Sequence, residues 1–210
     1  MDRKNTILFG SIIIAAIVAT VFSIGAVNST SVSNLNRDCM TAEQSKGITT
    51  FNKIPTVLPQ GYSIQCVALD SDNEVDMLIS DRTVESNEWQ SESVNPSGNN
   101  IFLHQTMETG VDYKELGNAE KRIRDTIAEI NEHNPSINAK YYLINGMPAY
   151  GTDSCKNCGT QTADFGDGTM IKQTYDVPSK LKIISDDGVR YSFYGNVPLD
   201  DLVKIGNSLQ

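Results

Sequence analysis

A long apolar segment near the start of the chain limits most strongly how the chain can fold and where it can reside. Residues 7–27, ILFGSIIIAAIVATVFSIGAV, carry no charge. A helix of about 20 apolar residues spans the roughly 30 Å hydrocarbon core of a bilayer. Arg3 and Lys4 precede the segment, and the next basic residue is Arg37. Because basic residues favour the cytoplasmic side, we expect a transmembrane anchor with a cytoplasmic N-terminus and a C-terminal domain outside the cell membrane.

A cleavable signal peptide is the alternative to this single-pass anchor. Ser23 and Gly25 are small enough for cleavage after Gly25, which would remove residues 1–25 and give a secreted protein. The apolar run is longer than the roughly 7–15 residues of a typical signal core. Both alternatives export the rest of the chain.

The exported part is acidic. Residues 1–27 contain one acidic and two basic residues, so 15 of the 17 basic and 25 of the 26 acidic residues remain, a formal charge of −10. Such a surface repels phosphate backbones, which argues against nucleic acid as a partner. An acidic surface also keeps an exported domain soluble.

The remaining chain divides into a stalk and one domain. Residues 28–38, NSTSVSNLNRD, are rich in Ser and Asn and predict a flexible stalk. Asn28 begins an Asn-Ser-Thr glycosylation sequon. Residues 39–210 are long enough for one domain with a hydrophobic core.

Most of the domain shows strand patterns broken by turn residues. Residues 62–69 and 74–80 predict a first hairpin, residues 101–107 predict the next strand, and five short strand patterns lie between 139 and 195. Asn145-Gly146, Asp167-Gly168 and Asp187-Gly188 are strong hairpin turns.

Two helices complete the predicted domain. Residues 119–133 place Ala119, Ile123, Ile127 and Ile130 on one face, and an apolar stripe after Pro198 predicts a closing helix. Because hairpins outnumber crossovers, we expect an α+β fold. It has one antiparallel, curved sheet, a central amphipathic helix and a C-terminal helix packed on one face, after the N-terminal transmembrane helix.

Three stretches resemble a family of exported domains of unknown function that follow single transmembrane helices, including anti-sigma-factor-like proteins. The first stretch, FNKIPTVLPQGYSIQ, leads into a strand; the second is YYLINGMPAY; the third, KLKIISDDGVRYSFYGNVPLDDLVKIGNSL, ends in a helix where Gly206 replaces the usual Ala. We expect the residues that match the family motif to have structural roles. They are Pro55, Leu58, Pro59, Gly61, Tyr62, Asn145 and Gly146.

The resemblance covers roughly residues 41–80 and 140–210, and does not extend in detail to 83–135. It implies a fold similar to lipoprotein carriers and sigma-regulator sensor domains, whose half-barrel sheets hold helices or a lipid chain on the concave side. The family has no catalytic motif to transfer.

Four cysteines, Cys39, Cys66, Cys155 and Cys158, favour two disulfides outside the cytoplasm. The simplest pairing joins Cys155 to Cys158 as a loop tie and Cys39 to Cys66 as a clamp. Two alternatives stay open for Cys155 and Cys158: thiol–disulfide exchange, and a metal site completed by Cys39 and Cys66 or by a Met or His. The surrounding sequence does not form a helix, so a thiolate there would lack dipole support.

The sequence therefore predicts a binding or sensor module without catalytic activity, cofactor or bound metal. The expected ligand is an apolar molecule or a neighbouring envelope protein. The alternative is a thiol–disulfide or metal-handling protein that uses Cys155 and Cys158. The two histidines, His104 and His133, have no evident triad partners and are expected to be structural. The acidic loop 70–74 lacks the glycine that a calcium loop needs.

Overall fold

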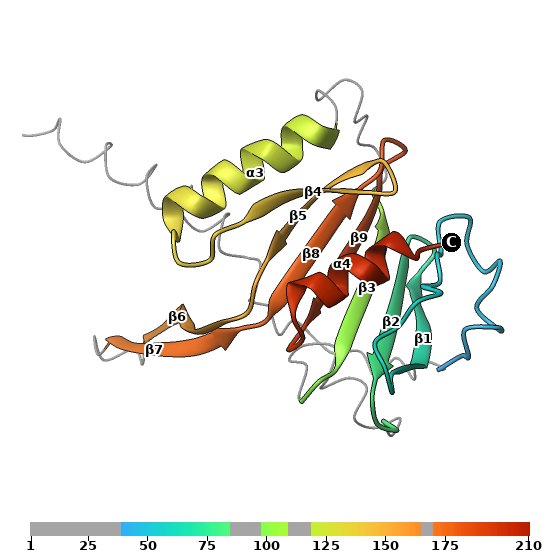
Figure 1. Cartoon of the computed structure of the whole chain (residues 1–210). Helices are drawn as coiled ribbons and strands as arrows, with labels where there is room; N and C mark the ends of the chain where they lie inside the picture. Colours follow the sequence, from blue (N-terminus) through green and yellow to red (C-terminus); the bar gives the residue numbers. More distant parts are fainter. Residues whose placement is uncertain (1–38, 85–97, 109–118, 165–169) are drawn as a thin grey trace, which may run out of the picture. The chain divides into compact units, whose positions relative to one another are not determined.

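The structure is a computed structural model that describes residues 39–84, 98–108, 119–164 and 170–210 (Figure 1). The side chains of residues 161–173 are not part of that description. The predicted anchor 7–27, the stalk and Asn28 lie outside the described residues. Within the described ranges, neither helix has the length and apolar character needed to cross a membrane.

The described chain forms nine strands and two helices. In chain order they are β1 (Ser63–Ser71), β2 (Glu74–Ser80), β3 (Ile101–Met107), α3 (Ala119–His133), β4 (Lys140–Ile144), β5 (Met147–Thr152), β6 (Cys155–Asp164), β7 (Met170–Val177), β8 (Ser179–Ile184), β9 (Val189–Gly195) and α4 (Leu199–Asn207). Residues 42–47, before the first strand, form turns.

Seven strands make one antiparallel sheet in the order β1-β2-β3-β9-β8-β5-β4. The β4–β5 and β8–β9 hairpins close at the turns that the sequence predicts. Asn145, Gly146 and Gly188 all adopt positive φ there, with values of 50°, 82° and 89°. Asn and Gly tolerate this backbone conformation, which explains why turn residues locate these hairpins well.

One side of the seven-stranded sheet holds the main hydrophobic core. Alternate residues of the central strands, such as Met77, Leu103 and Phe193, are fully or almost fully buried there. Helix α4 packs on the same side against β8, and its Leu202 and Ile205 join the core cluster. Phe51, Ile54 and Leu58 of the segment before β1 fill the rest of it. We call this the apolar side.

Helix α3 contributes to a separate cluster. Ala119 and Ile123 pack with Tyr150 of β5 and Ile184 of β8. Tyr150 and Ile184 alternate with the core residues Ala149 and Ile183, so α3 lies on the side opposite α4. The prediction that both helices cover one face is therefore wrong. The two stripes are similar in sequence, and nothing in them specifies a side of the sheet.

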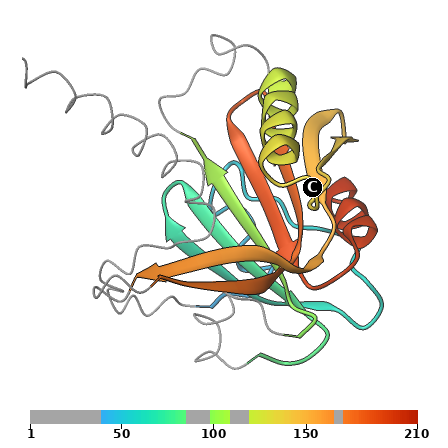
Figure 2. The same cartoon turned by 90° about the vertical axis from the view of Figure 1, so that its left-hand side faces the viewer.

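The prediction of a single sheet is also wrong. Strands β6 and β7 pair only with each other and form a second sheet. This hairpin continues from β5 and β8 and extends away from the seven-stranded sheet (Figures 1 and 2). We call β6 and β7 the arm. The sequence of β6, CKNCGTQTAD, lacks large apolar residues, so it has little to bury against a core.

Candidate functional site

The side of the sheet opposite the apolar side carries a polar row across its central strands. Cross-strand pairing aligns Asp76 of β2 with His104 of β3, then Ser192 of β9, Lys182 of β8 and Tyr150 of β5. Residues directly opposite each other in antiparallel strands lie on the same face. We call this face, with the neighbouring Thr106, Lys180, Arg190 and Tyr194, the polar face.

Asp76, His104 and Thr106 form a continuous hydrogen-bonded chain on the polar face. The Asp76 Oδ1 atom lies 2.5 Å from His104 Nδ1, and Thr106 Oγ1 lies 2.7 Å from His104 Nε2. Asp76 and Thr106 are buried, at 4% and 8% exposed, while His104 is half-buried. A buried carboxylate beside an imidazole stabilises the protonated ring.

The pKa of His104 reflects two opposing effects. Burial favours the neutral ring, but the hydrogen bond and the charge of Asp76, helped by Glu74, outweigh burial and raise the pKa above the usual value. The sequence does not show this partnership, because residues 81–100 separate β2 from β3 and no tight turn sets their register. The other histidine, His133, donates a hydrogen bond from Nδ1 to the Glu129 carbonyl of its own helix, 2.8 Å away.

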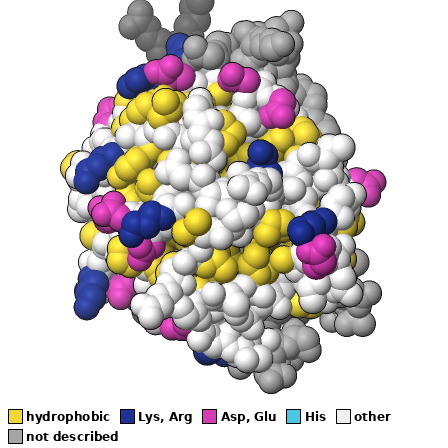
Figure 3. All heavy atoms as spheres, turned by 45° about the vertical axis from the view of Figure 1, so that its right-hand side comes forward, with side chains coloured by type: hydrophobic (Ala, Val, Ile, Leu, Met, Phe, Trp, Pro, Cys, Tyr) yellow, Lys and Arg dark blue, Asp and Glu magenta, His cyan; other side chains and the backbone are white. Residues whose placement is uncertain are grey.

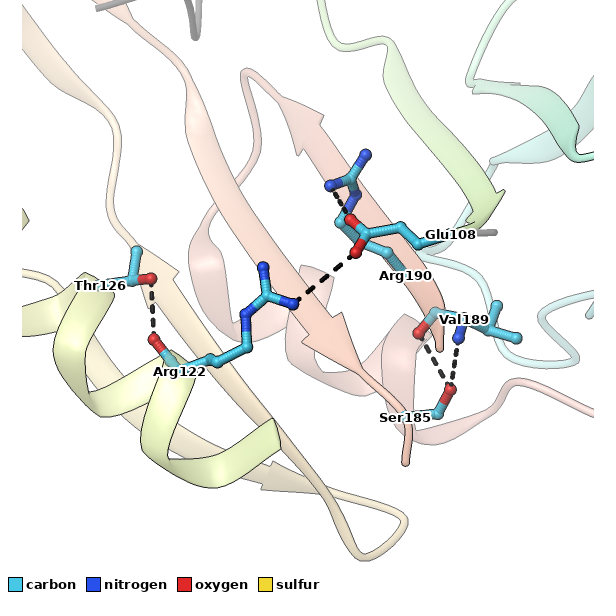
Figure 4. Close-up of polar contacts among 6 residues, drawn as sticks. All are labelled: Glu108, Arg122, Thr126, Ser185, Val189 and Arg190. Carbon is cyan, nitrogen blue, oxygen red and sulfur yellow. Dashed lines mark hydrogen bonds and ion pairs between the residues drawn. The ribbon is translucent and has the colours of Figure 1, made fainter. Parts of the chain in front are cut away.

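A second polar group joins β3, β9 and α3 (Figure 4). The Glu108 carboxylate lies between Arg190, with which it forms an ion pair, and Arg122 Nη1 at 3.8 Å from Oε2. Close by, Ser185 closes the β8–β9 turn, because its hydroxyl lies 3.0 Å from both the amide and the carbonyl of Val189. Glu108 thus has both oxygens engaged by arginines.

Two lysines lie side by side on the polar face of β8. Lys180 pairs across the sheet with Tyr194 and Thr152, and Lys182 pairs with Ser192 and Tyr150. Both lysines are half-buried. Burial lowers the pKa of Lys180, and burial together with Arg190 lowers that of Lys182 to about 8. The alternation of Lys180 and Lys182 with Leu181 and Ile183 in β8 was the sequence signal for this pair.

The first cysteine pair links the start of the described chain to β1. Cys39 and Cys66 are joined in a disulfide with their Cα atoms 5.2 Å apart. Next to it, Met40 and Val67 exchange two backbone hydrogen bonds of 2.9 and 3.0 Å. Cys66 is buried and Cys39 is exposed. This disulfide therefore fastens the segment that precedes β1 to the edge of the sheet.

The second cysteine pair lies at the base of the arm. Cys155 and Cys158 are joined in a disulfide with Cα atoms 5.6 Å apart. Cys155 pairs with Val177, and the next aligned pair is Gly159 with Tyr175, so three residues of β6 face one residue of β7. The disulfide therefore encloses a bulge in a strand, not the first turn of a helix.

The bulge is fixed by local contacts. Asn157 adopts a positive φ of 55°, and its amide donates to Asp176 Oδ1 at 2.8 Å. Immediately beyond it, the Tyr175 ring lies over Gly159, where a Cβ atom would overlap the ring. Tyr175 remains 49% exposed. Each of these contacts holds the base of the arm in one conformation.

The residues that carry the family resemblance occupy structural positions. Pro55 bridges to Leu209 after α4, and Leu58 and Tyr62 pack against the main core. Gly61 has a φ of 85°, and the Tyr62 amide donates to the Pro59 carbonyl at 3.0 Å. In the β4–β5 turn, the side chain of Asn145 donates to the Asn207 carbonyl at the end of α4, at 3.1 Å, and Gly146 follows it.

Two hollows of the described surface lie away from the polar face. One, of about 340 Å³, is lined by residues 48–51, Leu69, Asp72, Asn73 and Met107. Another, of about 310 Å³, lies between residues 57–60 and α4. Across the described ranges, no three His, Cys, Asp or Glu side chains gather as they would to hold a metal ion.

Comparisons with protein-family models, curated proteins and solved structures find no match to this chain. The resemblance to exported domains therefore stays a prediction from three short stretches. The arm and the polar face are the two candidate sites that the geometry of the described residues offers.

Proposed function

We propose that this chain is an extracytoplasmic binding module, not an enzyme, and that it binds a protein through the arm. The observation that carries the proposal is the separation of β6 and β7 from the seven-stranded sheet. A two-stranded hairpin is only marginally stable in water without further packing. A hairpin held at its base by a disulfide, with an exposed Tyr175, is well suited to contact a partner, because exposed tyrosines are enriched at interfaces.

An apolar small molecule has less support as the ligand. The apolar side of the sheet is occupied by α4 and by Phe51, Ile54 and Leu58. A lipid carrier needs an enclosed cavity lined mainly by apolar side chains. On the face drawn in Figure 3, hydrophobic side chains show in separate patches, and acidic and basic side chains are interspersed among them.

The proposed location outside the cytoplasm has two supports. Residues 7–27 form an uncharged segment behind Arg3 and Lys4, which favours export and a membrane anchor. The two cysteine pairs are also typical of an oxidising compartment. Thiol–disulfide exchange by Cys155 and Cys158 has less support, because a strand bulge offers no helix dipole to stabilise a thiolate.

Site-specific photo-crosslinking tests the proposal. A photoreactive phenylalanine analogue replaces Tyr175 in the full-length chain, and the matched control replaces Val57, which is 54% exposed on a loop beside α4. Irradiation of intact cells should give one discrete protein adduct from position 175 and none from position 57. The proposal is wrong if both positions give the same adducts, or if native mass spectrometry shows a stoichiometric lipid.

A further inference from the structure

The polar face contains two cationic side chains that no carboxylate of the described residues pairs with. The side-chain ammonium groups of Lys180 and Lys182 take part in no hydrogen bond or ion pair with the residues that the structure describes. By contrast, the exposed lysines Lys121 and Lys204 each pair with an aspartate, at 2.6 and 2.8 Å. Partly burying a cation without a partner costs free energy.

The nearest carboxylate on the polar face does not relieve this cost. Glu108 raises the pKa of Lys182, but burial, Arg190 and Arg122 lower it by more. Both oxygens of Glu108 are already directed at arginines (Figure 4). Among the described residues, the positive charge of the two lysines is therefore not balanced by a paired carboxylate.

The neighbours of the lysines are suited to bind an anion. The four side chains directly across from them on β9 and β5 all carry hydroxyl groups: Ser192, Tyr194, Tyr150 and Thr152. Hydroxyl groups donate hydrogen bonds to carboxylate and phosphate oxygens. Tyr150 and Thr152 are buried, at 6% and 3% exposed, whereas Ser192 and Tyr194 are half-buried. The accessible hydroxyl groups beside the lysines are therefore those of β9: Ser192 lies opposite Lys182, and Tyr194 lies opposite Lys180.

We infer that Lys180 and Lys182 bind two carboxylates of an extended acidic peptide segment of the partner. This inference rests on the proposed function, because it names the chemistry of the protein that the arm contacts. Lys180 pairs with Thr152 in the last aligned pair of β5 and β8, just before the chain leaves to form the arm. A partner bound along the arm therefore reaches the polar face at Lys180.

Spacing favours an extended peptide over a single anion. Two residues apart on a strand, Lys180 and Lys182 are separated by about 6.8 Å along β8. Acidic residues at alternate positions of an extended peptide have the same spacing and point to the same side. Each carboxylate then pairs with one lysine, and the ion pairs are shielded because both lysines are half-buried.

The test uses the full-length protein in neutral detergent and three synthetic peptides at low salt. The matched peptide is Ser-Glu-Ser-Glu-Ser, the spacing control is Ser-Glu-Glu-Ser-Ser, and the charge control is Ser-Gln-Ser-Gln-Ser. Calorimetry should detect the matched peptide, with affinity about tenfold weaker for the spacing control and no binding of the charge control. Equal affinity for both acidic peptides would overturn the inference, as would no binding at all.

Protein variants locate the binding to the polar face. The double variant Lys180→Gln/Lys182→Gln should lose about tenfold or more in affinity for the matched peptide. The control Lys46→Gln/Lys140→Gln removes the same charge from two exposed positions and should change affinity less than about twofold. Equal losses in both variants would show a general charge effect and overturn the inference.

Two further readouts keep the result interpretable. The far-UV circular dichroism of the Lys180→Gln/Lys182→Gln variant should match the wild type, and a Lys182→Gln single variant is the reserve if the double variant does not fold. Binding to vesicles with anionic phospholipid, but not to the acidic peptide, would overturn the choice of carboxylate. If the matched peptide does not bind but position 175 still gives a discrete protein adduct, this inference is wrong and the proposed function still holds.

Discussion

Replacing Cys39 by serine should lower the free energy of unfolding by about 3.6 kcal/mol. The Cys39–Cys66 disulfide spans 27 positions, and closing a loop of about 28 residues restricts the unfolded chain by roughly that amount. Cys39 is exposed, so serine there costs no packing, and the buried Cys66 keeps its sulfur. The Met40–Val67 hydrogen bonds still hold this segment in the folded state. The loss is therefore mainly an effect on the unfolded chain.

Urea denaturation of the full-length protein without reductant, followed by circular dichroism, measures this loss. The matched control is Cys155→Ser, which opens a loop of about four residues and should cost at most about 2 kcal/mol. Alkylation without reductant should label neither pair in the wild type. A loss below about 1 kcal/mol for Cys39→Ser, or a larger loss for Cys155→Ser, would refute the loop-closure reasoning.

Three further predictions concern the sheet. Gly195→Ala should destabilise by about 2 kcal/mol or more in thermal unfolding, because the new Cβ would lie 2.5 Å from the backbone oxygen of Asn100; an unchanged melting temperature would contradict this. Because the pKa of His104 is raised in the folded protein, the protonated ring stabilises the fold. This contribution to the free energy of unfolding is present below about pH 6.5 and is lost as the pH rises through the pKa of His104 in the folded state. His104→Gln should therefore show a flatter urea-midpoint profile between pH 6 and 8, and parallel profiles would contradict the assignment. Lys182→Met should raise the free energy of unfolding by about 1 kcal/mol below pH 8, where the lysine is charged. This gain should fade towards pH 10.5. A lower free energy of unfolding at pH 7 would show instead that Lys182 stabilises the fold.

The sequence predicts local structure well in this chain. Helix α3 runs from Ala119 to His133, the range that the apolar stripe indicates. The turns at Asn145-Gly146 and Asp187-Gly188 lie where the sequence places them, because these residues adopt positive φ at low cost. Each of these features is encoded within about 15 neighbouring residues.

Long-range features were not predictable in the same way. The sequence does not show that α3 and α4 pack on opposite sides, because a stripe specifies a buried face but not its partner. The separate sheet of β6 and β7 was missed because polar strands such as residues 155–164 give no hydrophobic alternation.

The polar face was predictable in part. Once the strand registers are known, the alternation in β8 places Lys180 and Lys182 together, and the pairing of β2 with β3 places Asp76 opposite His104. The degree of burial and the engagement of Glu108 by two arginines depend on α3 and β9. Those contacts join residues far apart in sequence, and no local pattern encodes them.

The path of the chain around β6 and β7 makes the arm a separable insertion. Strands β5 and β8 are already adjacent and antiparallel at Thr152 and Lys180, so a turn of a few residues could join them directly. Homologous chains could then gain, lose or exchange this hairpin while the seven-stranded sheet keeps its order. Recognition could diversify in the hairpin while the rest of the domain, with its core and both helices, stays unchanged.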